Sequence, residues 1–160
     1  MNIGLRPVRE KDAQFLYEIM NDENILDALD EVPTQPDDWA NAISAWNCDP
    51  DEEDYIILDE NTPIGWLGVN GLLSEDRTAY IKMIGLLPQY QNKGAGSYVI
   101  DHILETLKVR GFLTAALYTN QNNFRAQRCY KKCGFKVTEE LVEEMANGNL
   151  AKRYKMEICL

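Results

Sequence analysis

The sequence has few of the residues on which several common chemistries depend. It holds a single histidine, His102, and its four cysteines are scattered along the chain. Zinc sites and cysteine nucleophiles need suitable partners close by, so no metal site is expected and a covalent cysteine mechanism has no partner base. Scattered cysteines in a chain with ample core-forming residues are typical of reduced thiols rather than a disulfide framework.

Basic residues are also scarce. Lysine and arginine together number 16, against 26 aspartates and glutamates, and the net charge is −10. Sequence-independent binding to nucleic acid depends on clustered lysine and arginine, so no nucleic-acid partner is expected. A cationic partner fits the charge balance better, although an acidic surface can serve solubility alone.

Long apolar runs are missing as well. No run approaches the roughly 20 residues that span a bilayer, and the amino-terminal segment MNIGLRPVREKD has no apolar stretch typical of a secretory signal. The sequence therefore predicts no membrane partner and a cytoplasmic location. A length of 160 residues without repeats or linker-like segments predicts a single domain over residues 1–160.

The spacing of the apolar residues predicts an α/β fold with a mixed sheet. The expected order is a strand, two helices, three antiparallel strands, a helix, a strand, a helix and two strands. These elements cover, in the same order, residues 3–8, 11–21, 36–46, 55–58, 64–73, 79–87, 97–110, 112–119, 123–133, 134–145 and 150–160. Residues 22–35 are expected to form a long acidic connection.

Two connections decide the expected topology. Residues 112–119 are almost continuously apolar, as in a strand that is covered on both faces. The helix before that strand makes it parallel to 79–87 through a right-handed crossover. Asn147-Gly148 predicts a hairpin between the last two strands. The glycine-containing segment QNKGAG, residues 91–96, then falls at a junction between a strand and a helix.

This glycine loop is a candidate anion site. The first turn of a helix offers free N–H groups and the positive end of the helix dipole, and glycine lets the backbone approach a ligand. A tight turn alone would also explain Gly94 and Gly96. A P-loop would need Gly-Lys-Ser/Thr after the second glycine, and a dinucleotide-binding loop would need glycine in place of Val99. The sequence fits neither.

Two spaced motifs resemble those of the GNAT family of N-acetyltransferases. The first is Q-x-x-G-x-G, from Gln91 to Gly96, three residues after a predicted strand. The second is N-x-x-N-x-x-A-x-x-x-Y-x-x-x-G-F, which is matched by Asn120, Asn123, Ala126, Tyr130, Gly134 and Phe135. The resemblance implies the GNAT fold, a mixed and mostly antiparallel sheet of about six to seven strands with flanking helices and a splayed parallel strand pair.

The resemblance also implies acetyl-CoA as the cosubstrate. In that family the loop amides hold the pyrophosphate of coenzyme A, and the preceding strand binds the pantetheine arm through its backbone. The implied cofactor-binding residues are Gly85, Leu86, Leu87, Gln91, Asn92, Lys93, Gly94, Ala95, Gly96, Ser97 and Asn123. Asn123 can also cap the helix that follows it, and the two roles do not compete.

Tyr130 is the catalytic side chain that the resemblance implies, as the acid that protonates the departing thiolate. A phenol of pKa about 10 and a thiol of pKa about 8.5 make this transfer uphill by about 2 kcal/mol. From the residues alone, an inward-packed aromatic whose hydroxyl meets a carbonyl remains the alternative.

The group that removes a proton from the acceptor amine is unassigned. Many family members carry a glutamate on the strand that matches 79–87, whereas this strand carries Lys82. By family layout the acidic connection borders the acceptor site, which implies substrate binding by Asp27, Asp30 and Glu31. A solvated acidic face is the alternative. Carboxylates that line the pocket would favour a cationic acceptor.

The resemblance implies an enzyme that moves acetyl from acetyl-CoA directly to a primary amine on a small cationic acceptor. Two other functions stay open. The acceptor could be a protein amino terminus or lysine, or the chain could be a non-catalytic acyl-CoA-binding module, because the strand carboxylate is missing. A homodimer that pairs through the carboxyl-terminal strand also stays open.

Overall fold

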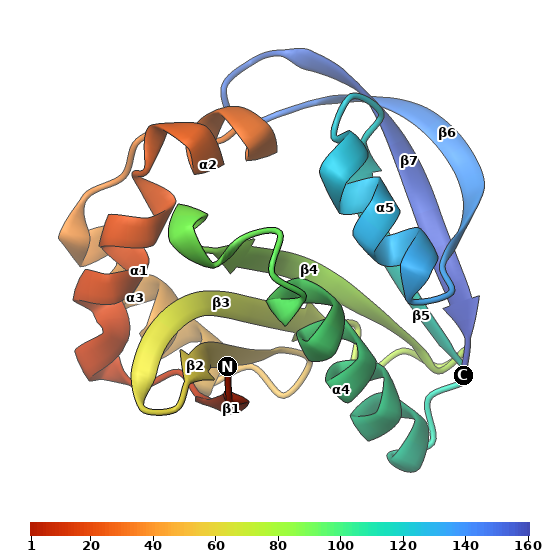
Figure 1. Cartoon of the computed structure of the whole chain (residues 1–160), viewed down its shortest axis with the longest axis horizontal. Helices are drawn as coiled ribbons and strands as arrows, with labels where there is room; N and C mark the ends of the chain where they lie inside the picture. The colour runs from red at the N-terminus through yellow and green to blue at the C-terminus, as the bar shows by residue number, and fades with distance from the viewer.

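A seven-stranded mixed sheet in the order β1-β2-β3-β4-β5-β7-β6 organises the chain, and the computed structural model describes all residues 1–160 (Figure 1). The strands are β1 (Ile3–Pro7), β2 (Glu53–Asp59), β3 (Thr62–Asn70), β4 (Thr78–Leu86), β5 (Thr114–Asn120), β6 (Lys136–Glu144) and β7 (Leu150–Cys159). The helices are α1 (Ala13–Met20), α2 (Glu23–Leu29), α3 (Pro36–Asn47), α4 (Ala95–Val109) and α5 (Phe124–Lys132). Short 3-10 helices are η1 (Glu10–Asp12) and η2 (Pro88–Tyr90).

The sheet divides where β4 meets β5. Every other pair of neighbouring strands is antiparallel, whereas β4 and β5 are parallel. These two strands pair only from Thr78 to Tyr80 and from Thr114 to Ala116, and both then continue beyond the paired part. The mixed sheet and the splayed parallel pair of the predicted GNAT fold are thus confirmed.

Two apolar clusters hold the helices against opposite faces of the sheet. One joins the buried stripe of α4 to sheet residues that include Ile57 and Leu67. The other joins α1 and α3 to Ile56 and Trp66. Successive side chains of a strand point to opposite faces, so β2 and β3 supply both clusters. No helix is both long and apolar enough to cross a membrane.

The carboxyl-terminal elements end where the sequence predicts. Gly134 follows α5 with a φ of 103°, a conformation in which a residue with a Cβ is strained. The turn at Asn147-Gly148 joins β6 to β7, which pair along their lengths. In this turn the Gly148 N–H donates to the Met145 carbonyl at 2.8 Å.

The region 22–35 differs from the predicted long connection because it contains α2. Asp22 caps this helix, and its carboxylate accepts hydrogen bonds from the N–H groups of Asn24 (3.0 Å) and Ile25 (3.3 Å). Ile25 is the one buried residue of α2. A helix this short with one buried side chain leaves little apolar periodicity, and the Asp22 cap is the signal that could have revealed it.

Candidate active site

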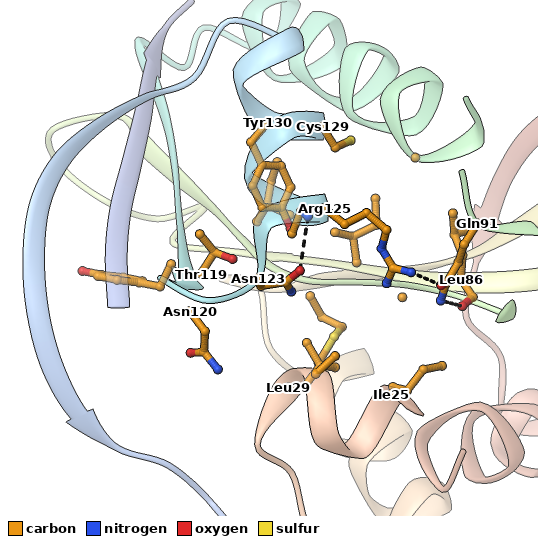
Figure 2. A pocket seen from close by; sticks show the side chains of 18 of the residues that line it. Ile25, Leu29, Leu86, Gln91, Thr119, Asn120, Asn123, Arg125, Cys129 and Tyr130 are labelled. Carbon is orange, nitrogen blue, oxygen red and sulfur yellow. Dashed lines mark hydrogen bonds between the residues drawn. The ribbon is translucent and has the colours of Figure 1, made fainter. Parts of the chain in front are cut away.

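A cavity of about 990 Å³ lies where β4 and β5 separate (Figure 2). Its walls come from residues 81–86 of β4 and 118–120 of β5, together with the start of α4 and one side of α5. Helix α2, the residue Glu31 that follows it, the end of β6 and the β6–β7 turn supply the rest of the lining. This volume is at the upper end of the range of about 300–1,000 Å³ that is usual for small-molecule sites.

The first turn of α4 presents unused backbone donors to this cavity. Gly94 precedes the helix with a φ of 86°, and the first helical bond runs from the Tyr98 N–H to the Gly94 carbonyl at 3.1 Å. The N–H groups of the first three residues, 95–97, therefore have no partner within the helix. Gly94, Gly96 and Ser97 line the cavity, so an anion could be bound here by backbone alone.

Eight of the eleven predicted cofactor-binding residues line the cavity, and three do not. Those in the lining are Gly85, Leu86, Gln91, Asn92, Gly94, Gly96, Ser97 and Asn123. The side chain of Leu87 packs against the α1–α3 cluster, that of Lys93 is exposed, and that of Ala95 is buried. A contact from Ala95 to a ligand would therefore have to come from its backbone N–H.

Gln91 joins the end of β4 to the start of α5. Its Nε2 donates to the Leu86 carbonyl at 2.9 Å, and its Oε1 accepts a hydrogen bond from Arg125 (Figure 2). The Leu86 carbonyl, which the resemblance implies for the pantetheine arm, thus already has a partner. The sequence places Arg125 near the expected coenzyme but favours a surface role for it, whereas the structure puts it in the cavity lining and in contact with Gln91.

Asn123 fixes the start of the helix that carries Tyr130. Its Oδ1 accepts a hydrogen bond from the Ala126 N–H at 3.2 Å (Figure 2), and the residue also lines the cavity. The capping role predicted for Asn123 is therefore present in the structure. Because the cap orders the first turn of α5, it also sets the direction in which α5 presents Tyr130.

Tyr130 reaches from α5 toward the cavity and lines it (Figure 2). Its ring packs edge-on against buried Phe135, with the ring centroids 6.1 Å apart. Burial raises the pKa of the Tyr130 phenol, and the neighbouring Cys129 thiol adds to the rise. The phenol therefore holds its proton at neutral pH, and the same rise makes its transfer to a thiolate harder than it is for an unperturbed phenol.

The opposite end of the cavity is acidic. Glu31, which follows α2, lines it together with Glu143 and Glu144 of β6. None of the salt bridges in the chain involves Glu31, and burial raises the pKa of its carboxyl group. Of the three predicted substrate-binding residues, only Glu31 is in the lining, because Asp27 is exposed and outside the cavity.

Asp30, the third of these residues, holds three chain segments together. Its carboxylate accepts hydrogen bonds from Asn120 at the end of β5 (2.6 Å) and from Asn147 (3.1 Å) and Asn149 (3.2 Å) in the β6–β7 turn. Partial burial opposes ionisation, but these donors lower the pKa of Asp30 overall. The residue next in the chain is Glu31, so this network fixes where Glu31 enters the cavity.

Basic side chains also line the cavity. Arg125, Arg128 and Lys132 of α5 belong to the lining. Lys82 and Arg153 line it too, but they pair with Glu52 and Glu143, so the unpaired charge is positive on α5 and negative at Glu31 and Glu144. An anionic ligand bound near α5, together with a cationic ligand bound near Glu31 and Glu144, matches this distribution of charge.

Lys82 occupies a bulge in β4, at the strand on which the resemblance implies a glutamate. The register of β3 and β4 shifts here, because Val69 faces Ile81 and Gly68 faces Met83. The Lys82 ammonium contacts the Glu52 carboxylate and lies 4.4 Å from the centre of the Trp46 ring. This side chain is already paired, and β4 contains no carboxylate that could remove the acceptor proton.

Comparison with known proteins agrees with this geometry. Residues 13–135 match the acetyltransferase (GNAT) family. The chain belongs to this family. An uncharacterised N-acetyltransferase of Mycobacterium bovis is 40% identical over 63 residues, which are 39% of this chain and 40% of that protein. The match thus spans less than half of the relative's length.

Solved structures resemble the whole chain. The spermidine N-acetyltransferase from Vibrio cholerae in complex with CoA and spermine has a TM-score of 0.89 and 24% identity, over 99% of this chain and 95% of that chain. An aminoglycoside acetyltransferase in complex with coenzyme A has a TM-score of 0.80 and 20% identity, over 99% and 95%. At these identities the likeness shows that the fold is shared.

Proposed function

We propose that the protein is an acetyl-CoA-dependent N-acetyltransferase that moves acetyl directly to a primary amine on a small cationic acceptor. The observation that carries this proposal is one cavity that passes from the free amides of α4, past the protonated Tyr130, to the unpaired Glu31. Membership of the GNAT family supports the reaction type.

The α4 side of the cavity suits the diphosphate of coenzyme A. The N–H groups of residues 95–97 point from a helix start, where the dipole favours an anion. Arg128 and Lys132, which also line the cavity, add positive charge to it. Backbone donors alone do not select a nucleotide, so the match to coenzyme A rests on the volume of the cavity and on the lining that it shares with Tyr130.

The proposed reaction is a direct attack on the thioester. The ammonium of the acceptor first loses a proton, which for an alkylamine of pKa about 10.4 costs about 4 to 5 kcal/mol at neutral pH. The amine nitrogen then forms a bond with the thioester carbonyl carbon as the carbon–sulfur bond breaks. Tyr130 donates its phenolic proton to the departing sulfur, so that coenzyme A leaves as the thiol, and the proton lost by the new amide nitrogen restores the phenol through solvent.

The acidic end supports a cationic acceptor. Glu31, Glu143 and Glu144 border this end, and Arg153 neutralises only Glu143, at 2.8 Å. Two carboxylates are left to attract an amine that carries further positive charge. The structural neighbours named for spermidine and for aminoglycosides make small amines with several nitrogens the first acceptors to try.

Incubation with acetyl-CoA and a panel of amines tests the proposal, with coenzyme A thiol release measured at several pH values. Small polycationic amines are expected to give the fastest release, and the rate should rise with pH as more free amine forms. Peptides with a free amino terminus or lysine, analysed by mass, test the protein-acceptor alternative. Coenzyme binding without thiol release for any amine would contradict the proposal and favour a binding module, which the absence of a β4 carboxylate makes worth testing.

A further inference from the structure

Thr119 is a buried polar residue of the cavity wall to which the proposed reaction gives no role. It is the last residue but one of β5, it lines the cavity, and it is 5% exposed (Figure 2). Its hydroxyl takes part in none of the side-chain hydrogen bonds of the chain. Asp54 Oδ2 is the only side-chain oxygen or nitrogen that is both fully buried and without a partner, so the Thr119 hydroxyl opens onto the cavity.

The alternation of side chains along β5 sets the direction of Thr119. Ala115 and Leu117 belong to the apolar cluster under α4, and residues two apart on a strand share a face, so Thr119 points to that face as well. Tyr130 packs against the same cluster. Thr119 and the proposed proton donor therefore line one cavity from one face of the sheet.

The strand holds Thr119 firmly on one side and leaves it free on the other. The last paired residues of β4 and β5 are Tyr80 and Ala116, so Thr119 comes three residues after β5 has lost this neighbour. On its other edge β5 stays paired, with Thr119 opposite Tyr154 of β7. The side chain thus has a fixed place beside the gap between the two parallel strands.

The other buried polar side chain on this part of β5 is already in use. Asn120 donates to Asp30 at 2.6 Å and accepts from Arg153 at 3.1 Å. On β4 the Lys82 ammonium is paired with a carboxylate. A buried hydroxyl without a partner costs free energy, which a ligand that bonds to it recovers. Thr119 is the residue of these two strands that offers such a group to a ligand.

The connections of Thr119 indicate which reactant meets its hydroxyl. The next residue, Asn120, is bonded to Asp30, and the residue after Asp30 is Glu31 at the acidic end of the cavity. An amine that is attracted by this end and reacts beside Tyr130 therefore passes the wall that carries Thr119.

A hydroxyl suits an amine that must lose a proton before it reacts. A carboxylate beside the nitrogen would favour the ammonium form, which cannot attack a thioester. A hydroxyl is uncharged and accepts a hydrogen bond from an N–H group in either protonation state. It can therefore hold the nitrogen after deprotonation as well as before it.

We propose that the Thr119 hydroxyl accepts a hydrogen bond from an N–H group of the acceptor amine and orients the nitrogen toward the thioester. This role rests on the proposed function and adds a contact with the reacting nitrogen. The hydroxyl transfers no proton, and Glu31 and Glu144 remain free to bind the other positive charges of the acceptor.

Thr119→Val tests this role, because it removes the hydroxyl and keeps the branched shape. With spermidine as the amine, kcat/KM should fall about tenfold, whereas the KM for acetyl-CoA should stay the same. Thr119→Ser restores the hydroxyl and should regain most of the lost activity.

Urea unfolding separates this role from a structural one. The free energy of unfolding of Thr119→Val should be unchanged or higher, because no other group of the chain loses a hydrogen bond. Ser74→Ala is the control, since the Ser74 hydroxyl donates to the Thr78 carbonyl at 2.8 Å and lies outside the cavity. This control should lower the free energy of unfolding and leave the kinetics with spermidine unchanged.

The methyl signal of Thr119 in a proton–carbon NMR spectrum tests the contact without turnover, as spermidine is added to the protein saturated with coenzyme A. A saturable shift is expected. A methyl signal that spermidine does not move, or an unchanged kcat/KM in Thr119→Val, would overturn the inference. A saturable shift in a chain that releases no thiol with any amine would instead contradict the proposed acetyl transfer and leave the contact in place.

Discussion

The two ends of the main cavity are built from different parts of the chain. The α4 end consists of backbone, with free N–H groups that follow one short loop around Gly94 and Gly96. The acidic end consists of side chains from distant segments, which meet because Asp30 binds Asn147 across 117 positions of sequence. A local motif therefore encodes the first end, whereas only the tertiary fold creates the second. Tyr130 lines the same cavity, and changes at each end should have separable effects.

The largest effect on activity is expected from a change at Tyr130. Tyr130→Phe removes the proton donor and keeps the ring that packs against Phe135. The turnover number should fall by about 100-fold, because general acids contribute about 100- to 10,000-fold, while the dissociation constant of acetyl-CoA changes little. Steady-state kinetics and calorimetry measure the two quantities. Tyr98→Phe, at an exposed tyrosine of α4, is the matched control, and equal turnover in both variants would remove Tyr130 from the chemistry.

The substitution Gly94→Val should weaken the binding of acetyl-CoA at the start of α4 and leave the acidic end of the cavity unchanged. Gly94 has a φ of 86°, and a branched residue held there costs on the order of 1–3 kcal/mol. The helix start then shifts, and acetyl-CoA affinity measured by calorimetry should fall at least about tenfold. Gly111→Val imposes similar strain at a φ of 94° outside the cavity and should leave the affinity unchanged. Equal loss in both variants would mean that stability, rather than the loop amides, controls binding.

The acidic end should respond to Glu31→Gln. A charge-assisted hydrogen bond contributes about 1.5–3 kcal/mol, so the KM for a polycationic amine should rise about tenfold while the KM for acetyl-CoA stays the same. Asp27→Asn removes a nearby carboxylate of α2 that does not line the cavity, and its KM values should match those of the unaltered chain. If both variants raise the KM for the amine alike, overall charge rather than the position of Glu31 attracts the acceptor.

Asp30→Asn should have the smallest effect, on stability rather than on chemistry. Loss of the charged acceptor for three asparagines should lower the free energy of unfolding by about 1 kcal/mol at neutral pH. The folded-state pKa of Asp30 is lowered, so its stabilisation is complete above the unfolded-state pKa and is lost as the pH falls through the folded-state value. Urea unfolding at neutral and acidic pH should show the difference between the two chains narrowing in acid. If the difference in unfolding free energy stayed the same at both pH values, the shape of the Asp30 side chain rather than its charge would stabilise the fold.

Local patterns made most of the fold predictable. The α4 stripe, the caps at Gly111 and Gly134 and the hairpin at Asn147-Gly148 each depend on neighbours within a few residues. The helix α2 was missed because it contains one buried residue, and its cap lies within a run of acids. Elements stabilised mainly by tertiary contacts leave a weak periodic signal.

The candidate site divides in the same way. Gly94, Gly96 and Tyr130 were predictable from motifs, and all three line the cavity. The sequence could not separate Glu31 from Asp27 and Asp30, because three acids in one segment become different only when the fold turns one of them into the cavity.

Backbone amide shifts on addition of coenzyme A test the proposed use of the cavity without relying on turnover. The largest saturable changes are predicted for the N–H groups of Ala95, Gly96 and Ser97, with further changes along residues 84–86 and around Tyr130. A spectrum in which these amides do not move at saturating coenzyme A, or in which the changes fall on another face of the molecule, would contradict the proposed binding mode.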